Sequence, residues 1–567
     1  MFSLHDPLAT SVRSELSEYD DLIAALLSRR GFVSRAEATT FLNPSYDEHL
    51  HDPLLMKNMP RAAKRLASAI ENKEHIAVWS DYDSDGIPGG VLMHDFLKKA
   101  GADFENYIPH RHEEGYGVNV DGIEKLAKRG TKLVITIDSG ITDVVPIKRA
   151  KELGMDVILT DHHLPGLELP DAFAVIDPKQ EGETYPFLEL CGAALSWKLL
   201  CAVLAVSPAI RERVPVGWEK WLLDMAGLAT IADMVPLVGE NRVIARYGLL
   251  VLRKSPRPGL QKLCRGMRVN QRTLTEDDVA FMIAPRVNAA SRMGDPMDAF
   301  RLFTTQDEGE ADLLAKKLEK ANRGRRAAAA AITREVHERL KERTEIPSVI
   351  ALGNPSWRPA LLGLVASGIA EEYARPVFLW GREGNTALKG SCRSDGSVHM
   401  IELMGRAEET FSQFGGHAAS GGFTVRDEAI FFLEERLVEA REKAPASVLA
   451  ESLKADALLT PEEATLEFLK QLERLAPFGE GNPKPVFLMR DVFIETIEWF
   501  GKGEEHLRLF LKNRKEPLEA ISFYAKRELG SKTKTLVPQK EQTLLVHLER
   551  NTFLRYPTAR LRLVAIG

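Results

Sequence analysis

The sequence predicts an α/β protein of about three domains: a parallel-sheet domain, a smaller α/β domain joined to it by a long helix, and a C-terminal β-barrel. Two patterns carry this prediction. From His75 onward, short β-rich runs alternate with helical stretches, and the last part of the chain holds strands broken by turns. At 567 residues and 44% hydrophobic content, the chain is long enough to bury several cores.

Composition narrows the class of protein. The four cysteines are far apart and form no CxxC pair, which argues against a disulfide framework and against structural zinc. The N-terminal stretch is charged throughout, and no apolar run approaches the ~18 residues of a membrane span, so we expect a cytoplasmic protein. The net charge is −6, yet the stretch from Gly501 onward has 14 basic against 7 acidic residues. This basic tail suggests a polyanionic partner.

Residues 1–70 read as helices and loops that we expect to pack on the core of the first domain, 71–307. In that domain, "HIAVWSDYD", "KLVITIDSG" and "DVILTDHH" are strands by length and β-branched content. The stretches "VLMHDFLKKAG" and "VVPIKRAKELG" are helices that end at glycine. This alternation predicts a parallel sheet covered by helices on both faces.

A long helix over 308–345, rich in Ala, Glu, Lys and Arg, is the predicted connector. The second α/β domain, 346–447, contains the strand "SVIALG", the helix "GLVASGIAEEY" and the strand "PVFLWG". Residues 451–567 have the profile of a small antiparallel barrel.

Acidic and imidazole side chains follow the three predicted strands of the first domain. They are Asp81, Asp83 and Asp85 after the first, Asp138 after the second, and Asp161, His162 and His163 after the third. Parallel strands end at one edge of the sheet, where ligands bind. The alternate spacing of the first three acids would also place them on one face of an extended chain. Such crowded carboxylates repel unless cations lie between them, so we expect metal.

Each motif alone has another interpretation. "DYDSDG" resembles the start of a calcium-binding EF-hand loop, but Leu92 stands where that loop requires Glu. The pair of histidines could be a surface patch, and Asp138 could cap a helix. Their occurrence at successive strand ends favours a two-metal site. Oxygen and imidazole ligands without thiolate favour Mn²⁺ or Mg²⁺.

The motifs "DYDSDG", "VITIDSG", "LTDHH" and "ATIADMVPL" resemble the four motifs of the DHH phosphoesterases. Similarity to a bacterial branch of exonucleases specific for single-stranded DNA extends over nearly the whole chain. It includes "YIPHRHEEGYGVN", "CGAALSWKLL", "APRVNAASRMGDP", the DHHA1-like "GSCRSDG" and "FGGHAASGG", and "RLAPFGEGNPKPVF".

The resemblance implies a role for each matching residue. The metal ligands would be Asp83, Asp85, Asp138, His162 and Asp233, and the catalytic group would be Asp81, Asp161, His163 and His417. Phosphate or other substrate contacts would come from Arg111, Arg286, Asn288, Ser391, Arg393, Gly415 and Gly416. Glycine pairs allow backbone N–H groups to approach a phosphate, and arginine binds two of its oxygens at once. Without the resemblance, "GGH" could be only a turn, and Arg286 and Arg393 could be ion-pair partners.

The family would make this chain a metal-dependent 5′→3′ exonuclease that degrades single-stranded DNA to mononucleotides in DNA repair and recombination. We expect a monomer whose further partners are a helicase and a single-strand-binding protein. The barrel would resemble an oligonucleotide-binding (OB) fold, with Trp499, Phe500, Phe510 and Tyr524 available for stacking or core packing, the latter favoured for Phe510. The alternatives are a DHH phosphodiesterase acting on short oligoribonucleotides or cyclic dinucleotides, and a non-catalytic DHH replication factor.

Three positions depart from the family pattern. "IPGG" follows the first motif, where hydroxyl residues are usual, and Pro88 there suits a first helical turn. Trp357-Arg358 replaces a Trp-His pair, and Ser80 replaces a glycine. None of these positions is a predicted metal ligand, so the departures concern rate and substrate rather than the metal site.

Overall fold

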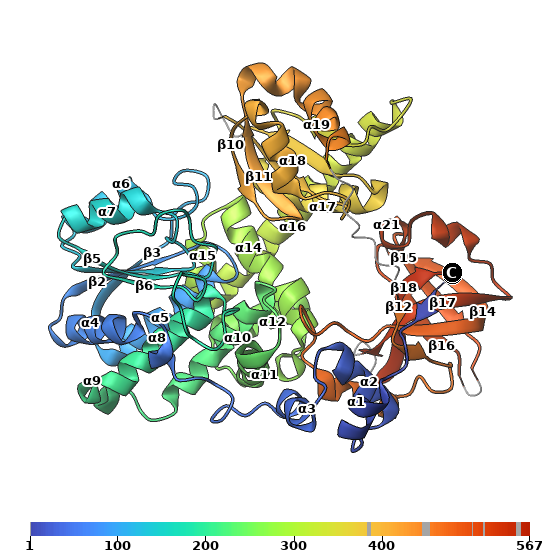
Figure 1. The fold of residues 1–567 in the computed structure, drawn as a ribbon, viewed down its shortest axis with the longest axis horizontal. Coiled ribbons are helices and arrows are strands. Elements are labelled where there is room, and N and C mark those ends of the chain that lie inside the picture. The colour runs from blue at the N-terminus through green and yellow to red at the C-terminus, as the bar shows by residue number, and fades with distance from the viewer. Residues whose placement is uncertain (1, 383–386, 445–453, 502, 514–515, 552–556) are drawn as a thin grey trace.

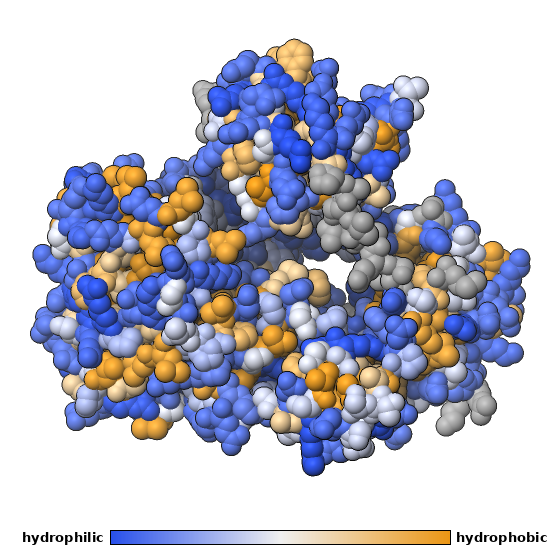
Figure 2. Space-filling view, viewed as in Figure 1, coloured by the Kyte–Doolittle hydropathy of each residue, from blue (hydrophilic) through white to orange (hydrophobic). Residues whose placement is uncertain are grey.

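The structure, a computed structural model, describes the 567-residue chain except residues 1, 383–386, 445–453, 502, 514–515 and 552–556. The described residues form three lobes (Figure 1): the parallel-sheet lobe, a second α/β lobe and a barrel lobe. Figure 2 shows an opening between the three lobes and a predominantly hydrophilic surface on this face. The predicted boundary between the second and third domains, at 447–451, lies outside the described residues. Among the described helices, none combines the length and apolarity needed to cross a bilayer.

The sheet of the first lobe confirms the predicted parallel topology. Its strand order is β3-β2-β4-β5-β6, and every neighbouring pair is parallel. The strands are β2 (His75–Ser80), β3 (Asp103–Tyr107), β4 (Leu133–Ile137), β5 (Asp156–Thr160) and β6 (Ala174–Ile176). All of β4 is buried, as expected of a strand covered on both faces.

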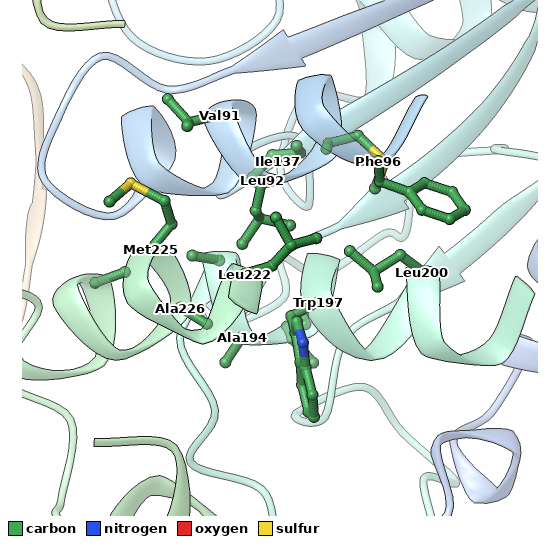
Figure 3. Packing of buried hydrophobic residues seen from close by; sticks show 14 of the residues in the cluster. Val91, Leu92, Phe96, Ile137, Ala194, Trp197, Leu200, Leu222, Met225 and Ala226 are labelled. Atoms are coloured by element: carbon green, nitrogen blue, oxygen red, sulfur yellow. The ribbon is translucent and has the colours of Figure 1, made fainter. Parts of the chain in front are cut away.

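Helices cover the two faces of this sheet. One face packs against α4 (Met59–Glu71), α5 (Gly86–Ala100), α8 (Gly192–Val206) and α10 (Leu223–Ala232). The other packs against α6 (Val120–Lys128) and α7 (Val144–Glu152). Figure 3 shows how α5 and α8 meet through Leu92 and Leu200 beside Ile137 of β4, with Met225 of α10 packed against α5. This apolar contact fixes the helix ends that border the strand termini.

The remaining helices of the lobe include α9 (Pro208–Arg213), which packs beside α8, and a group that extends toward the connector. This group is α11 (Gly239–Leu252), α12 (Pro258–Met267), α13 (Glu276–Asp278), α14 (Ala284–Met293) and α15 (Met297–Thr304). The π-helical turn η4 (Val279–Ile283) leads directly into α14. The predicted connector is α16 (Glu308–Lys341), a single helix of 34 residues that runs from the first lobe to the second.

The second lobe is a mixed five-stranded sheet of order β10-β11-β9-β8-β7. Its strands are β7 (Ile350–Gly353), β8 (Val377–Gly381), β9 (Leu388–Arg393), β10 (Phe411–Gly416) and β11 (Ser420–Val425). Only β7 and β8 pair in parallel, which confirms the predicted strand–helix–strand unit around α17 (Pro359–Tyr373). The helices α18 (Met400–Arg406) and α19 (Leu433–Glu442) complete the lobe.

The third lobe is the predicted barrel. Its strands are β13 (Ala457–Leu458), β14 (Phe487–Phe500), β15 (His506–Leu511), β16 (Leu518–Ser522), β17 (Lys540–Asn551) and β18 (Thr558–Ile566). The barrel closes because β14 pairs with both β15 and β17. On β15 the leucines face the core while Phe510 lies on the outer, half-buried face, so the prediction that Phe510 belongs to the core is wrong.

The N-terminal region corrects a prediction. Its last helix, α4, and the segment before it, which includes Leu54 and Met56, pack on the sheet lobe. The helices α1 (Thr10–Glu15), α2 (Asp21–Arg29) and α3 (Arg35–Leu42) lie on the barrel. Leu26 of α2 shares a core with Phe487 of β14, and β1 (Ser3–Leu4) pairs with β12 (Lys454–Ala455). The apolar face of α2 could pack against either lobe, so its sequence pattern does not predict which lobe it contacts.

Candidate active site

Carboxylates and imidazoles converge at the carboxyl edge of the first sheet, as the sequence predicts. Strands β2, β4 and β5 end at Ser80, Ile137 and Thr160, and the polar motifs occupy the loops that follow. Asp233 arrives from a different direction, as the residue that caps the C-terminus of α10. Three groups hold ligand atoms within 4.8 Å of one another: Asp138 with His162 and His163, Asp85 with His162 and Asp233, and Asp81 with Asp83 and Asp138.

His162 lies at the centre of this cluster. Its Nε2 is 3.1 Å from Asp138 Oδ1 and 3.6 Å from one carboxylate oxygen each of Asp85 and Asp233. Burial, together with the charge of the neighbouring His163, lowers the pKa of His162 to about 3. A neutral imidazole with a free lone pair is the form that binds a metal ion.

The first motif reaches the cluster by a turn and not by strand alternation, which corrects the expectation of an extended chain. After Ser80 the backbone folds into a turn, and Asp83 Oδ1 accepts hydrogen bonds from the N–H groups of Asp85 and Gly86 at 2.8 and 3.1 Å. Helix α5 then begins at Gly86, and Pro88 lies in its first turn as predicted. The turn directs Asp83 toward Asp81 and Asp138, and Asp85 toward His162 and Asp233.

Asp85 is buried against the N-terminus of α8. Its two carboxylate oxygens accept hydrogen bonds from the N–H groups of Gly192 and Ala193, at 2.6 and 2.8 Å. A helix N-terminus presents unpaired N–H groups and a partial positive charge, so it stabilises this carboxylate in the ionised form. Burial and Asp83 oppose that effect and raise the pKa of Asp85 to about 6.

The acidic cluster is electrostatically unfavourable without cations. Burial and nearby carboxylates raise the pKa of Asp81 and Asp138 well above the usual range and that of Asp233 to about 9. Asp81 Oδ1 is buried and accepts no hydrogen bond from the described residues. Unsatisfied carboxylate oxygens at this density fit divalent cations, and a donor set of oxygens and imidazole suits Mn²⁺ or Mg²⁺.

Asp161 acts on its neighbours and is not a member of the three ligand groups. Its Oδ1 lies 2.7 Å from His163 Nδ1, and its Oδ2 accepts a hydrogen bond from the N–H of Ile141 at 2.9 Å. Burial lowers the pKa of His163, but the hydrogen bond and charge of Asp161 outweigh it and raise that pKa to about 9. A protonated, half-exposed His163 therefore borders the metal cluster.

The predicted substrate residues divide into those with open hydrogen-bonding capacity and those already engaged. Arg111 lies over the ring of Tyr82, 4.8 Å from its centroid. Arg286 is buried, pairs with Glu319 at 2.7 Å and donates to the carbonyl of Met282. Arg286 is therefore held by Glu319 of α16. It forms the ion pair that the sequence offered as the alternative to phosphate binding.

Asn288 binds the metal loop. Its side-chain oxygen accepts from the N–H of Ser84 at 2.9 Å, and its amide donates to Ser84 Oγ at 3.1 Å. Ser84 lies between Asp83 and Asp85, so Asn288 orients the loop that carries these two carboxylates. We assign it a positioning role.

The remaining candidates lie in the second lobe. Arg393 and Ser391 are half-buried on β9, and a Cβ added at Gly363 of α17 would lie 2.8 Å from Arg393 Nη2. Gly415 and Gly416 end β10 and are exposed, and His417 follows in the turn, where its N–H donates to the carbonyl of Ser420 at 2.7 Å. The glycine pair therefore forms an exposed hairpin end, and the first-lobe metal cluster does not include His417.

Sequence reasoning missed two residues. Arg292 of α14 donates to the carbonyl of Ala360 in α17, so it joins the first lobe to the second. Burial and the charge of Arg111 lower its pKa to about 10. Tyr116 is 53% exposed, and its hydroxyl lies 3.4 Å from the carbonyl oxygen of Asp138 and 3.5 Å from His163 Nδ1. Arg292 lies in the motif "APRVNAASRMGDP" and Tyr116 in "YIPHRHEEGYGVN", so their place in these family motifs could have indicated a functional role.

Three family models match the chain. The DHH family, N-terminal domain, matches residues 75–230; the DHHA1 domain matches 345–448; and the RecJ OB domain matches 455–565. These matches correspond to the three lobes.

Curated relatives and solved structures agree with the models. The chain is 35% identical to the single-stranded-DNA-specific exonuclease RecJ of Bacillus subtilis over 88% of its own length and 63% of that relative, so it spans less than two thirds of that protein. It is 30% identical to the Escherichia coli protein of the same name over 88% and 89% of the two chains. Its fold matches the crystal structure of RecJ from Thermus thermophilus in complex with Mn²⁺, with a TM-score of 0.80, 28% identity, and coverage of 100% and 78%. The Mg²⁺ complex of that protein matches with a TM-score of 0.75.

Proposed function

This chain belongs to the RecJ family of single-stranded-DNA-specific exonucleases, and from that premise we propose that it hydrolyses single-stranded DNA from the 5′ end to mononucleotides. The observation that carries the proposal is the convergence of Asp83, Asp85, Asp138, His162 and Asp233 at the edge of the first sheet. Arginines such as Arg292, which has no carboxylate within ion-pair distance among the described residues, lie nearby. Carboxylates that repel one another so strongly are arranged to hold cations, and the arginines are arranged to hold phosphates.

Two divalent ions, Mn²⁺ or Mg²⁺, would be held by these five side chains, and when bound they supply an activated water and stabilise the charge of the phosphate. The protein side chains carry out the remaining tasks. Its side chains fix the ligand oxygens, bind the phosphate and provide a proton near it.

Asp161 and His163 form the pair that can handle a proton. Asp161 holds Nδ1–H of His163 at 2.7 Å and keeps the imidazole protonated at neutral pH, because its charge raises that pKa to about 9. The cationic ring then faces the negatively charged phosphodiester, where it stabilises charge or donates a proton from Nε2 to an oxygen. Hydrolysis of the bond to the 3′ oxygen of the first nucleotide releases that nucleotide and leaves a 5′ phosphate on the next one.

Phosphates would be bound by Arg111, Arg292 and Arg393, for which no carboxylate lies within ion-pair distance among the described residues. Arg111 and Arg292 belong to the first lobe, and Arg393 belongs to the second. Arg292 donates to Ala360 of α17, and Arg393 lies beside Gly363 of the same helix. A binding site built from two lobes can admit one flexible strand end, and this supports action on ends.

The barrel would bind the strand farther from the cut. On its outer face Arg562 lies 4.8 Å from the ring centroid of Phe523, and Lys526 lies 5.2 Å from that of Trp499. Aromatic rings provide stacking surfaces for bases, and the basic groups provide contacts for phosphates. Neither contact depends on base identity, which agrees with a nuclease that degrades any sequence.

We further propose a monomer that acts in the cytoplasm, with a helicase and a single-strand-binding protein as suppliers of substrate. The need for these two partners follows from the substrate, because a single strand must first be released from a duplex.

The test is digestion of the same single strand labelled at its 5′ or its 3′ end, as DNA and as RNA, with Mn²⁺ or Mg²⁺. We expect labelled mononucleotide as the first product of the 5′-labelled DNA and a gradual shortening of the 3′-labelled DNA. Cleavage confined to short oligoribonucleotides or cyclic dinucleotides would instead identify the phosphodiesterase alternative. Binding of DNA without hydrolysis would identify the non-catalytic one.

A further inference from the structure

The connector α16 carries an apolar stripe that changes its partner midway. Near the N-terminal end of the helix, Leu314 and Leu318 belong to the core of the first lobe. Near the C-terminal end, Ile332 and Val336 belong to the core of the second lobe. Between Asn322 and Ile332 no residue of the helix is buried, so this part crosses between the two lobes.

Arg325 occupies the stripe within this crossing segment. It follows buried Asn322 by three residues, which places both on the same face of the helix. Arg325 Nε and Nη2 donate to Asn322 Oδ1 at 3.1 and 2.9 Å. The preceding Gly324 lies against Met293 of α14, since a Cβ there would be 3.5 Å from the Met293 methyl group. Arg325 therefore lies where the connector meets α14, in the segment that crosses between the lobes.

The charge of Arg325 has no counterion in the part of the chain that the structure describes. Its guanidinium donates to the neutral Asn322, whereas Arg286 of α14 and Arg323 of the connector lie near Glu319. Burial, with the charges of Arg326 and Arg286, lowers the pKa of Arg325. Helix α14 holds the metal loop through Asn288 and Ser84, and its next turn carries Arg292 and meets the connector where Met293 lies beside Gly324. The charges of Arg111 and Arg325 both lower the pKa of Arg292, as expected if they lie near it. Along α14 the arginines therefore form a series that leads away from the metal loop, from Arg292 to Arg325.

We propose that Arg325 binds a backbone phosphate of the single strand beyond the nucleotide being cut, so that the connector helix is part of the substrate track. The inference rests on the proposed function and deepens it. A half-buried guanidinium oriented by Asn322 is rigid and lacks a counterion, and a phosphodiester supplies the missing charge and two acceptor oxygens. Its position beyond Arg292 in the series assigns it to an interior phosphate and not to the terminal one.

The experiment compares Arg325→Gln with Arg334→Gln in the full-length chain. Arg334 is an exposed arginine nine residues along the same helix, which places it on the opposite face. Each variant is assayed on a single strand of about 20 nucleotides and on a dinucleotide, with and without a 5′ phosphate, and its melting temperature is measured.

For Arg325→Gln we expect KM for the long strand to rise roughly tenfold, the effect of losing one charged contact. The rise should be the same with and without the 5′ phosphate, and much smaller for the dinucleotide. The slope of log KM against log salt should fall by ~0.7, the value for one phosphate of a single strand. Arg334→Gln should leave all of these unchanged.

Three outcomes would overturn the inference. A loss confined to 5′-phosphorylated substrates would assign Arg325 to the terminal phosphate. An equal loss on dinucleotide and long strand, with a lowered melting temperature, would make it a structural residue, and no loss at all would remove it from the track. If the unsubstituted chain does not cut single-stranded DNA, the proposed function fails first and is distinguished from these cases.

Discussion

Gly192 at the start of α8 lies directly against Asp138 at the end of β4, so closely that a Cβ at Gly192 would be 2.6 Å from the Cβ of Asp138. Asp138 itself has a left-handed backbone, with φ of 59°. This conformation is strained for most side chains and turns the carboxylate toward His162. Strain and close packing together fix the central ligand of the cluster.

Asp138→Asn should therefore test the metal site more cleanly than Asp138→Ala. Asparagine adopts the left-handed conformation readily, so the backbone is kept while the charge is removed. Removing a carboxylate also relieves repulsion in the metal-free site. We expect the cleavage rate to fall more than about a hundredfold, which exceeds the effect of losing a residue that only hydrogen-bonds a metal ligand. The melting temperature in EDTA should be unchanged or raised. Activity near that of the original chain would refute the two-metal assignment.

Gly192→Ala should disturb the same contact from the helix side. The added methyl group must displace Asp138 or α8, and α8 also supplies the N–H groups that hold Asp85. We predict weaker metal binding, measured by titration of activity with Mn²⁺. Gly266→Ala is the control, because no atom lies within 4 Å of the added Cβ.

The pH dependence of stability without metal follows from the raised carboxyl pKa values. Asp85 at about 6 and Asp233 at about 9 hold protons that an unfolded Asp, with a pKa near 3.9, has already lost. Between these values the two folded carboxyls bind more protons than their unfolded forms, so their contribution to stability falls as pH rises from about 4 to 9. In EDTA, the melting temperature should be higher at pH 5.5 than at pH 8.5 for this reason, and saturating Mn²⁺ should reduce the difference. Asp233→Asn should also reduce it, and an equal slope in that variant would contradict the assignment.

Asn288→Ala separates positioning from substrate binding. Asn288 hydrogen-bonds Ser84 in the loop that carries Asp83 and Asp85. We therefore expect Mn²⁺ binding to weaken about 10- to 100-fold, as for other residues that hydrogen-bond metal ligands or their loop. KM for DNA at saturating Mn²⁺ should change little. A rise in KM for DNA at unchanged metal affinity would instead assign Asn288 to substrate binding, the role that the family resemblance implies.

Arg393→Ala should change substrate preference. If Arg393 binds the terminal phosphate, cleavage of 5′-phosphorylated strands should drop about ten- to a hundredfold relative to 5′-hydroxyl strands, as expected for ~1.5–3 kcal/mol. Gly363→Ala should act in the same direction, because its methyl group would lie 2.8 Å from Arg393 Nη2. Equal losses on both substrates would assign Arg393 to the internal backbone or to the fold.

Much of this architecture could be predicted from local patterns. The buried strands, their polar ends and the long connector each have a signal within a few residues. The packing of α2 on the barrel could not be predicted, because its apolar face fits either lobe and its contacts lie more than 400 residues away, as for Arg29 with Asp456. The sequence also could not show that Arg286 pairs with Glu319 or that Asn288 holds Ser84, because partners 33 and 204 residues apart leave no local pattern.

The packing of α2 also changes how barrel binding is tested. Deleting the barrel from residue 451 would expose α2 and its neighbours, so its effect on DNA binding would be mixed with unfolding. Phe523→Ala on the outer face avoids this and should weaken binding to long strands by ~1–3 kcal/mol, the contribution of one stacked base.

The central claim is that the acid and histidine cluster cuts single-stranded DNA from its 5′ end, and a time course on 5′-phosphorylated, 5′-labelled single-stranded DNA with Mn²⁺ tests it most directly. The account predicts that labelled mononucleotide appears first and without longer labelled intermediates, that EDTA or Asp138→Asn abolishes it, and that fully duplex DNA resists. Labelled fragments of intermediate length, or undiminished release by the Asp138→Asn variant, would contradict it.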